Sequence, residues 1–132
     1  MRSLPILLLG VLLAVAGNCQ QRERVRIVTA GHTNARTAFG VHWLEGSLDS
    51  AGYRVEVTTD ASPAPGTIRI LVGALADRRV SAALRSNHAY PDSLPGREGF
   101  KNLGHGRRVV IGGRDSSGTL YGCIALSDKV RS

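Results

Sequence analysis

Short runs, most of them rich in β-branched residues, alternate along this chain with longer segments in which an apolar residue recurs every three or four positions. The short runs predict strands at 24–28, 53–58, 68–72, 98–103 and 107–112. The longer segments predict helices at 34–51 and 115–130, with a shorter helix at 77–84. The resulting order is βαββ(α)ββα. It predicts an α+β domain with a mixed β-sheet of about five strands and two main helices.

The first main helix has clear signals at both ends. Thr33 or Asn34 can cap its N-terminus, and Gly52 is a suitable stop. Gly40 and Gly46 lower its helical propensity by about 1 kcal/mol each relative to Ala. Phe39 and Trp43 lie beside an apolar stripe that we expect to face the core, formed by Ala38, Val41, Leu44, Leu48 and Ala51.

The last helix is expected to begin at a cap on Asp115 or Ser116. We expect its inner face to use Leu120, Ile124 and Val130, with Cys123 and Leu126 alongside. Cys123 is predicted to act as a small buried hydrophobic residue. The chain has two cysteines, Cys19 and Cys123, and a disulfide between them is possible but not indicated.

The N-terminal residues resemble an export signal. Arg2 is followed by an almost wholly apolar stretch at 4–16 that ends in Ala14-Val15-Ala16, a small-x-small cleavage pattern. The stretch is shorter than the roughly 20 apolar residues of a membrane-spanning helix. We therefore predict a signal peptide at 1–16, a polar leader at 17–23, and a secreted, periplasmic or cell-envelope protein.

Cys19 leaves a lipoprotein interpretation open. It follows the apolar run directly, and the preceding Ala16-Gly17-Asn18 partly resembles a bacterial lipidation box, in which Asn18 is a poor fit. In this alternative the chain is an envelope lipoprotein with an interaction role. Membrane association is expected only if Cys19 is lipidated.

The net charge of +7 does not by itself indicate a binding partner. The basic residues form no run of five or six, and few aromatic residues lie among them, so we expect no nucleic-acid partner. A solvated basic surface explains most of the charge. The alternative is a glycan-binding module that attracts acidic polysaccharides. It would use the two arginine pairs Arg78-Arg79 and Arg107-Arg108.

No catalytic, cofactor-binding or metal-binding residues are predicted. The turn after Gly31 and the turn at 112–118 both join a strand to a helix, but neither carries a complete phosphate-binding motif. His42 and Glu45 form half a metal site without a second ligand pair. A Gly-x-Ser-x-Gly elbow is missing. A small hydrolase with an unrecognised site stays a further alternative.

The C-terminal region carries the most specific pattern in the chain. Glu98-Gly99-Phe100 begins a strand, a hairpin follows, and a Gly-x-Asp-x-x-Gly-x-Leu-Tyr-Gly pattern then opens the last helix. The residues that match this pattern are Gly113, Asp115, Gly118, Leu120, Tyr121 and Gly122. It resembles the N-terminal accessory domain that precedes the catalytic barrel in alpha-glucuronidases and beta-N-acetylhexosaminidases.

The resemblance spans residues 24–131 and implies a glycoside-hydrolase-type accessory domain at 24–132. The matching residues have a structural rationale, and the resemblance implies the same structural role. Asp115 can cap the helix, Gly118 and Gly122 allow close packing, Leu120 faces the core, and Tyr121 can bury its ring while its hydroxyl reaches a partner. It also implies that the catalytic acids belong to a barrel that is absent from this chain. The expected partner is that barrel or a carbohydrate.

Overall fold

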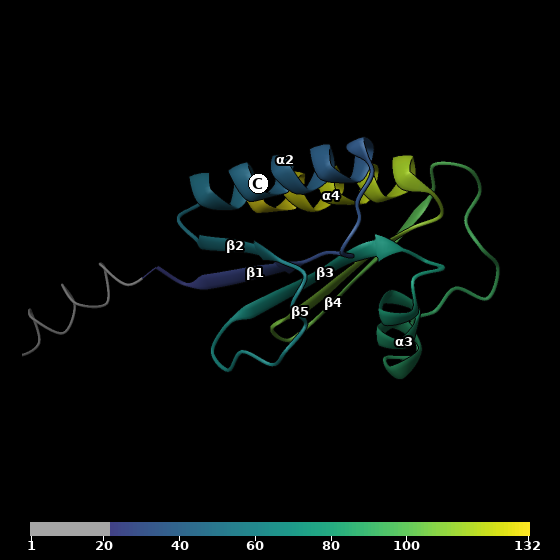
Figure 1. Ribbon diagram of the computed structural model, residues 1–132, viewed down its shortest axis with the longest axis horizontal. Helices are drawn as coiled ribbons and strands as arrows, with labels where there is room; N and C mark the ends of the chain where they lie inside the picture. Colours follow the sequence, from purple (N-terminus) through teal and green to yellow (C-terminus); the bar gives the residue numbers. More distant parts are fainter. Residues whose placement is uncertain (1–21) are drawn as a thin grey trace, which may run out of the picture.

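The computed structural model describes residues 22–132 (Figure 1). The predicted signal peptide at 1–16, most of the polar leader and Cys19 lie outside the described residues. The elements follow the predicted order: β1 (Arg24–Val28), α2 (Ala35–Ser50), β2 (Arg54–Thr58), β3 (Ile68–Ala74), α3 (Arg78–Ser86), β4 (Phe100–His105), β5 (Arg108–Gly113) and α4 (Ser116–Arg131). The predicted α+β class is confirmed, with five strands in a mixed sheet and α3 as a third helix.

The five strands form one sheet in the order β2-β1-β3-β5-β4. β1 runs parallel to β2 and β3, and β3 runs parallel to β5. Only β4 is antiparallel to its neighbour β5 within this sheet. The two are joined by a tight turn in which Gly106 has a φ of +59°, a conformation that glycine adopts without steric cost.

Helices α2 and α4 cover one face of the sheet, and α3 lies against one end of the other face (Figure 1). Because strand side chains alternate between faces, the sheet supplies two separate apolar clusters. The cluster under α2 and α4 contains Val25, Ile27, Val41, Leu44, Leu48, Ile70, Val72, Ile111 and Cys123. The cluster under α3 contains Val28, Leu71, Leu75, Val80, Leu84 and Val110.

The caps and ends of α2 agree with the sequence, but its predicted stripe is partly wrong. Asn34 is the N-cap and accepts a hydrogen bond from the Thr37 amide. Ala38 and Ala51 are exposed, and small or polar residues take part in the buried face instead. The buried residues of the helix are Thr37, Gly40, Val41, Leu44, Ser47 and Leu48.

The predicted inner face of α4 is corrected in the same way. Leu120, Ile124 and Val130 are only half-buried, whereas Thr119, Gly122, Cys123 and Ser127 are buried. The two helices lie so close that a methyl group on Gly40 would sit 3.0 Å from the Leu120 Cα atom. Thr119 and Gly122 lie against the sheet instead, where they face Gly113 and Ile111. Small residues thus occupy close contacts of both kinds, which a count of large apolar residues does not reveal.

None of the helices formed by residues 22–132 combines the length and the apolarity needed to cross a bilayer.

Candidate functional site

The two halves of the C-terminal sequence pattern meet at the start of α4. Asp115 is the N-cap of this helix, and its Oδ1 atom accepts a hydrogen bond of 2.8 Å from the Gly118 amide. Its Oδ2 atom accepts a second hydrogen bond of 3.0 Å from the amide of Glu98. These two backbone hydrogen bonds, with that from Glu98 first, lower the pKa of Asp115 from its ordinary value.

The segment before β4 is held tightly at this junction. The Arg114 amide donates to the Gly99 carbonyl oxygen at 2.8 Å. Glu98 has a φ of +61°, in the left-handed region that L residues rarely adopt. In this conformation the Glu98 amide points at Asp115. The hydrogen bond between them therefore forms with Glu98 in an unfavourable backbone conformation.

Three glycines of the pattern occupy positions where a side chain would collide. A Cβ atom on Gly113 would overlap the Thr119 backbone, and one on Gly118 would overlap the Gly99 carbonyl oxygen. A Cβ atom on Gly122 would lie 2.6 Å from the Ile111 side chain. The glycines thus let α4 rest directly on β5 and on the segment before β4.

Leu120 and Tyr121 do not behave as the resemblance implies. Leu120 is half-buried against α2 instead of facing the sheet, beside Gly40. Tyr121 is 42% exposed. It lies two positions from both Thr119 and Cys123, which face the sheet, so the helical period directs its ring away from the sheet.

The outer surface of the helix layer carries exposed aromatic residues. Phe39 is 55% exposed and Trp43 is 41% exposed on α2, and their rings stack with centroids 6.1 Å apart. The Arg131 guanidinium lies 5.2 Å from the centre of the Trp43 ring. We call Phe39, Trp43 and Tyr121 the outer aromatic surface. The sequence placed Phe39 and Trp43 beside the core stripe. Phe39 lies two positions from Val41, so the helical period could have indicated that its ring faces away from the sheet.

Most acidic side chains already have a structural partner. Asp77 and Asp115 cap helices, and Asp60 closes a turn through Ser62. Four further acids pair with a basic side chain, in the pairs Glu23–Arg107, Glu45–His42, Asp49–Arg22 and Glu56–Arg26. The acids are therefore spread over the fold as caps, turns and ion pairs.

His42 and Glu45 are brought together only as an exposed pair. The His42 Nδ1 and Glu45 Oε1 atoms are 3.8 Å apart. Within residues 22–132, no group of three or more His, Cys, Asp or Glu side chains is placed to hold a metal ion. Burial raises the pKa of the Cys123 thiol to about 12, so this side chain stays protonated at neutral pH and is a poor nucleophile.

The two predicted arginine pairs lie at opposite ends of the sheet. Arg79 donates to the carbonyl oxygens of Thr29 and Thr59, which follow the carboxyl ends of β1 and β2. Arg107 lies in the turn before β5, where it donates to the Gly66 carbonyl and pairs with Glu23. The four arginines predicted as one glycan site are thus not brought together.

No protein-family model and no curated protein matches the sequence. Several solved structures share the fold, and two of them illustrate the likeness. One, described as a GH138 enzyme targeting pectin rhamnogalacturonan II, has a TM-score of 0.60 and 25% sequence identity, over 82% of this chain and 13% of that chain. The other, CpGH84D, has a TM-score of 0.69 and 15% identity, over 83% of this chain and 18% of that chain.

This chain therefore spans less than a fifth of each of these glycoside hydrolases. The likeness fits a small non-catalytic domain of such an enzyme.

Proposed function

We propose that this chain is a secreted, non-catalytic accessory domain of a carbohydrate-degrading enzyme of the alpha-glucuronidase or beta-N-acetylhexosaminidase type, which supports a catalytic barrel. The observation that carries the proposal is the pattern of coverage. The two glycoside hydrolases match most of this chain but only 13% and 18% of their own length. The remaining length of such an enzyme can hold a catalytic domain, and the domain formed by this chain would support it.

The outer aromatic surface is the part of the fold suited to contact a catalytic domain. Phe39, Trp43 and Tyr121 project away from the sheet, and their side chains belong to neither of the two apolar clusters. Large aromatic side chains are enriched at protein interfaces, where they bury much area at a low cost in conformational entropy. Arg131 beside Trp43 adds a donor at the edge of this surface.

Site-specific crosslinking tests the proposal. A photoreactive phenylalanine analogue replaces Phe39 in the full chain, and a matched control carries it at Arg78, an exposed position on α3. After irradiation in the source cells, mass spectrometry identifies the adducts. We expect position 39, and not position 78, to capture a polypeptide with a glycoside-hydrolase catalytic domain. Equal capture by both positions, or capture of a different class of protein, would overturn the proposal.

The secreted location is tested separately by the mass of the mature N-terminus. Cleavage after Ala16 leaves an unmodified terminus at Gly17, which is the expected result. A lipid-modified Cys19 would replace this part of the proposal by the envelope-lipoprotein alternative.

A further inference from the structure

The sheet face opposite α2 and α4 carries a row of arginines. In the register of the parallel strands, Arg26 of β1 lies opposite Arg69 of β3, and Arg69 lies opposite Arg108 of β5. Arg24 of β1 lies opposite Arg54 of β2. Because neighbouring strands are about 4.8 Å apart, these five side chains share one small area, which we call the arginine face.

Helix α3 leaves the arginine face open. The residues beneath α3 include Val28, Leu71 and Val110. Each follows an arginine of the row, Arg26, Arg69 and Arg108 respectively, by two positions on the same strand and therefore lies on the same side of the sheet. Since α3 covers only this apolar end, the arginine end of the face is left without a helix over it.

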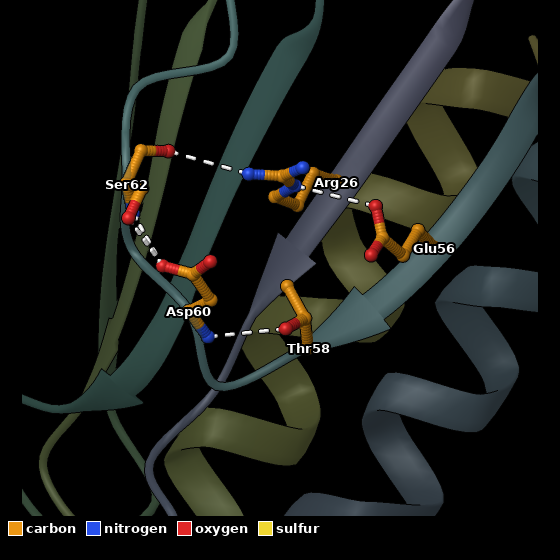
Figure 2. A network of polar contacts seen from close by, with 5 residues as sticks. All are labelled: Arg26, Glu56, Thr58, Asp60 and Ser62. Atoms are coloured by element: carbon orange, nitrogen blue, oxygen red, sulfur yellow. Dashed lines mark hydrogen bonds and ion pairs between the residues drawn. The ribbon is translucent and has the colours of Figure 1, made fainter.

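Hydrogen bonds fix two of the arginine side chains in the row. Arg26 donates to Glu56 and to the Ser62 carbonyl oxygen, both at 3.3 Å, and so links β1 to β2 and to the loop that follows it (Figure 2). The same loop is closed by the Ser62 amide and hydroxyl, which both donate to the Asp60 Oδ1 atom. Arg69 donates to the Ala61 carbonyl oxygen at 2.9 Å.

The outer members of the row are not neutralised. Within residues 22–132, Arg24, Arg54 and Arg108 take part in none of the ion pairs. Like charges directly opposite each other on neighbouring strands destabilise a sheet. A bound anion would relieve this repulsion.

Two open hollows border the row. One, of about 340 Å³, is lined by Arg26, Arg69, Arg107, Arg108 and the loop at 63–67. The other, of about 860 Å³, is lined by Arg22, Arg24, Arg54 and the end of the same loop, together with Val55 and two acids that are already paired, Glu23 with Arg107 and Asp49 with Arg22. Pro65, Gly66 and Thr67 belong to both, so the hollows adjoin each other along the edge of the sheet.

We propose that the arginine face binds an anionic polysaccharide whose sugars carry carboxylates. The planar fork of a guanidinium matches a carboxylate in a bidentate way, and several forks in a row suit a chain with repeated carboxylates. No aromatic side chain lines either hollow, which disfavours single-stranded nucleic acid because its bases need stacking partners. The exposed large apolar residues also lie elsewhere, so this face has nothing to insert into a bilayer.

The choice of a glycan rests on the proposed function, whereas the anionic character rests on the arginines alone. Helices α2 and α4, which carry the exposed residues of the outer aromatic surface, cover the opposite side of the sheet (Figure 1). A glycan bound at the arginine face would therefore not compete with a catalytic domain at the helix layer.

Binding of the full chain to polygalacturonate tests the inference, with the methyl-esterified polymer as the uncharged counterpart. The triple variant R24Q/R54Q/R108Q alters three exposed members of the row. The matched control R78Q/R97Q/R114Q alters three exposed arginines outside it and has the same net charge. We expect about tenfold weaker binding for the first variant, less than about twofold for the control, and weakening of wild-type binding by salt.

Three results would overturn the inference. The two triple variants could lose affinity equally, the methyl ester could bind as tightly as the acid, or single-stranded DNA or phosphatidylserine vesicles could bind more tightly than polygalacturonate. Absence of binding by the wild-type chain would do the same. Unfolding curves confirm that each variant is folded, and R108Q alone is expected to show a smaller loss in the same direction. If polygalacturonate binding fails but position 39 still crosslinks to a catalytic domain, only this inference is rejected. If the binding is observed but the crosslinking fails, only the proposed function is rejected.

Discussion

The carboxylate of Asp115 binds the Glu98 amide through Oδ2 at 3.0 Å while its other oxygen caps α4. One side chain thus joins the first turn of the last helix to a segment 17 residues earlier in the chain. The Glu98 backbone, in the left-handed region, is fixed at the same point. Residues that are separate in the sequence pattern therefore form one structural junction.

This junction predicts a specific acid sensitivity. The pKa of Asp115 is lowered in the folded state from an ordinary value of 3.8. A lowered folded-state pKa contributes stability that is present above pH 3.8 and is lost as the pH falls through the folded-state value. In D115N, we expect the free energy of unfolding to be lower at neutral pH and to fall less steeply below pH 3.8. Urea unfolding at several pH values measures both effects.

The control for this experiment is D128N, which alters an exposed carboxylate near the other end of α4. Asp60 also has a lowered pKa, caused first by its side-chain hydrogen bond with Ser62 and also by the Ser62 amide. It contributes in the same pH range in every variant, so the comparison between variants isolates Asp115. Parallel pH curves for the wild-type chain and D115N would contradict the assignment.

The two glycines inside α2 predict opposite effects of one substitution. A methyl group on Gly46 meets nothing within 4 Å, so G46A should stabilise the helix by about 0.5–1 kcal/mol. A methyl group on Gly40 would press on the Leu120 backbone and on Cys123, and overpacking typically costs about 1–3 kcal/mol. Thermal unfolding should therefore rank G46A above the wild type and G40A below it. The reverse order would contradict the close contact between α2 and α4.

The thiol of Cys123 should be inert in the folded chain. It is fully buried, and its pKa is raised to about 12 by burial. In a C19S variant of the full chain, we expect a thiol reagent at neutral pH to label Cys123 only as fast as the protein opens. Labelling should become rapid in denaturant. Rapid labelling under native conditions would show that α4 does not pack as described.

The outer aromatic surface should contribute little to the stability of the domain. Because Phe39 and Trp43 are exposed, we expect the double variant F39S/W43S to change the free energy of unfolding by less than about 1 kcal/mol. On the same helix, L44A should cost about 2–5 kcal/mol because Leu44 is fully buried. A loss in F39S/W43S as large as in L44A would place these aromatic residues in the core and remove the argument for an interface.

Local signals were sufficient to predict the order of elements. Runs rich in β-branched residues predicted β1, β2, β3 and β5, and Asn34, Gly52 and Asp115 marked helix ends that the structure contains. These signals depend on a residue and its near neighbours in the chain. The sequence alone therefore carried the α+β class and the cap at the start of α4.

Features that depend on contacts between distant segments could not be predicted. The inner faces of α2 and α4 include small or polar residues such as Thr37, Gly40 and Ser127, and Gly40 is buried because α4 approaches it closely. The arginine face arises from the register of parallel strands, which no spacing within one strand specifies. The predicted glycan site that combined Arg78-Arg79 with Arg107-Arg108 was wrong for the same reason. Whether these residues lie close together depends on the sheet topology, which the sequence did not reveal.

The central claim is that this fold supports carbohydrate breakdown without performing it. The most direct measurement is hydrolysis of a panel of aryl glycosides, including glucuronides and N-acetylhexosaminides, by the purified full chain. The account predicts no release of the aryl group above the buffer rate. Turnover that is proportional to the protein concentration and abolished by an acid-to-amide substitution such as E45Q would contradict it.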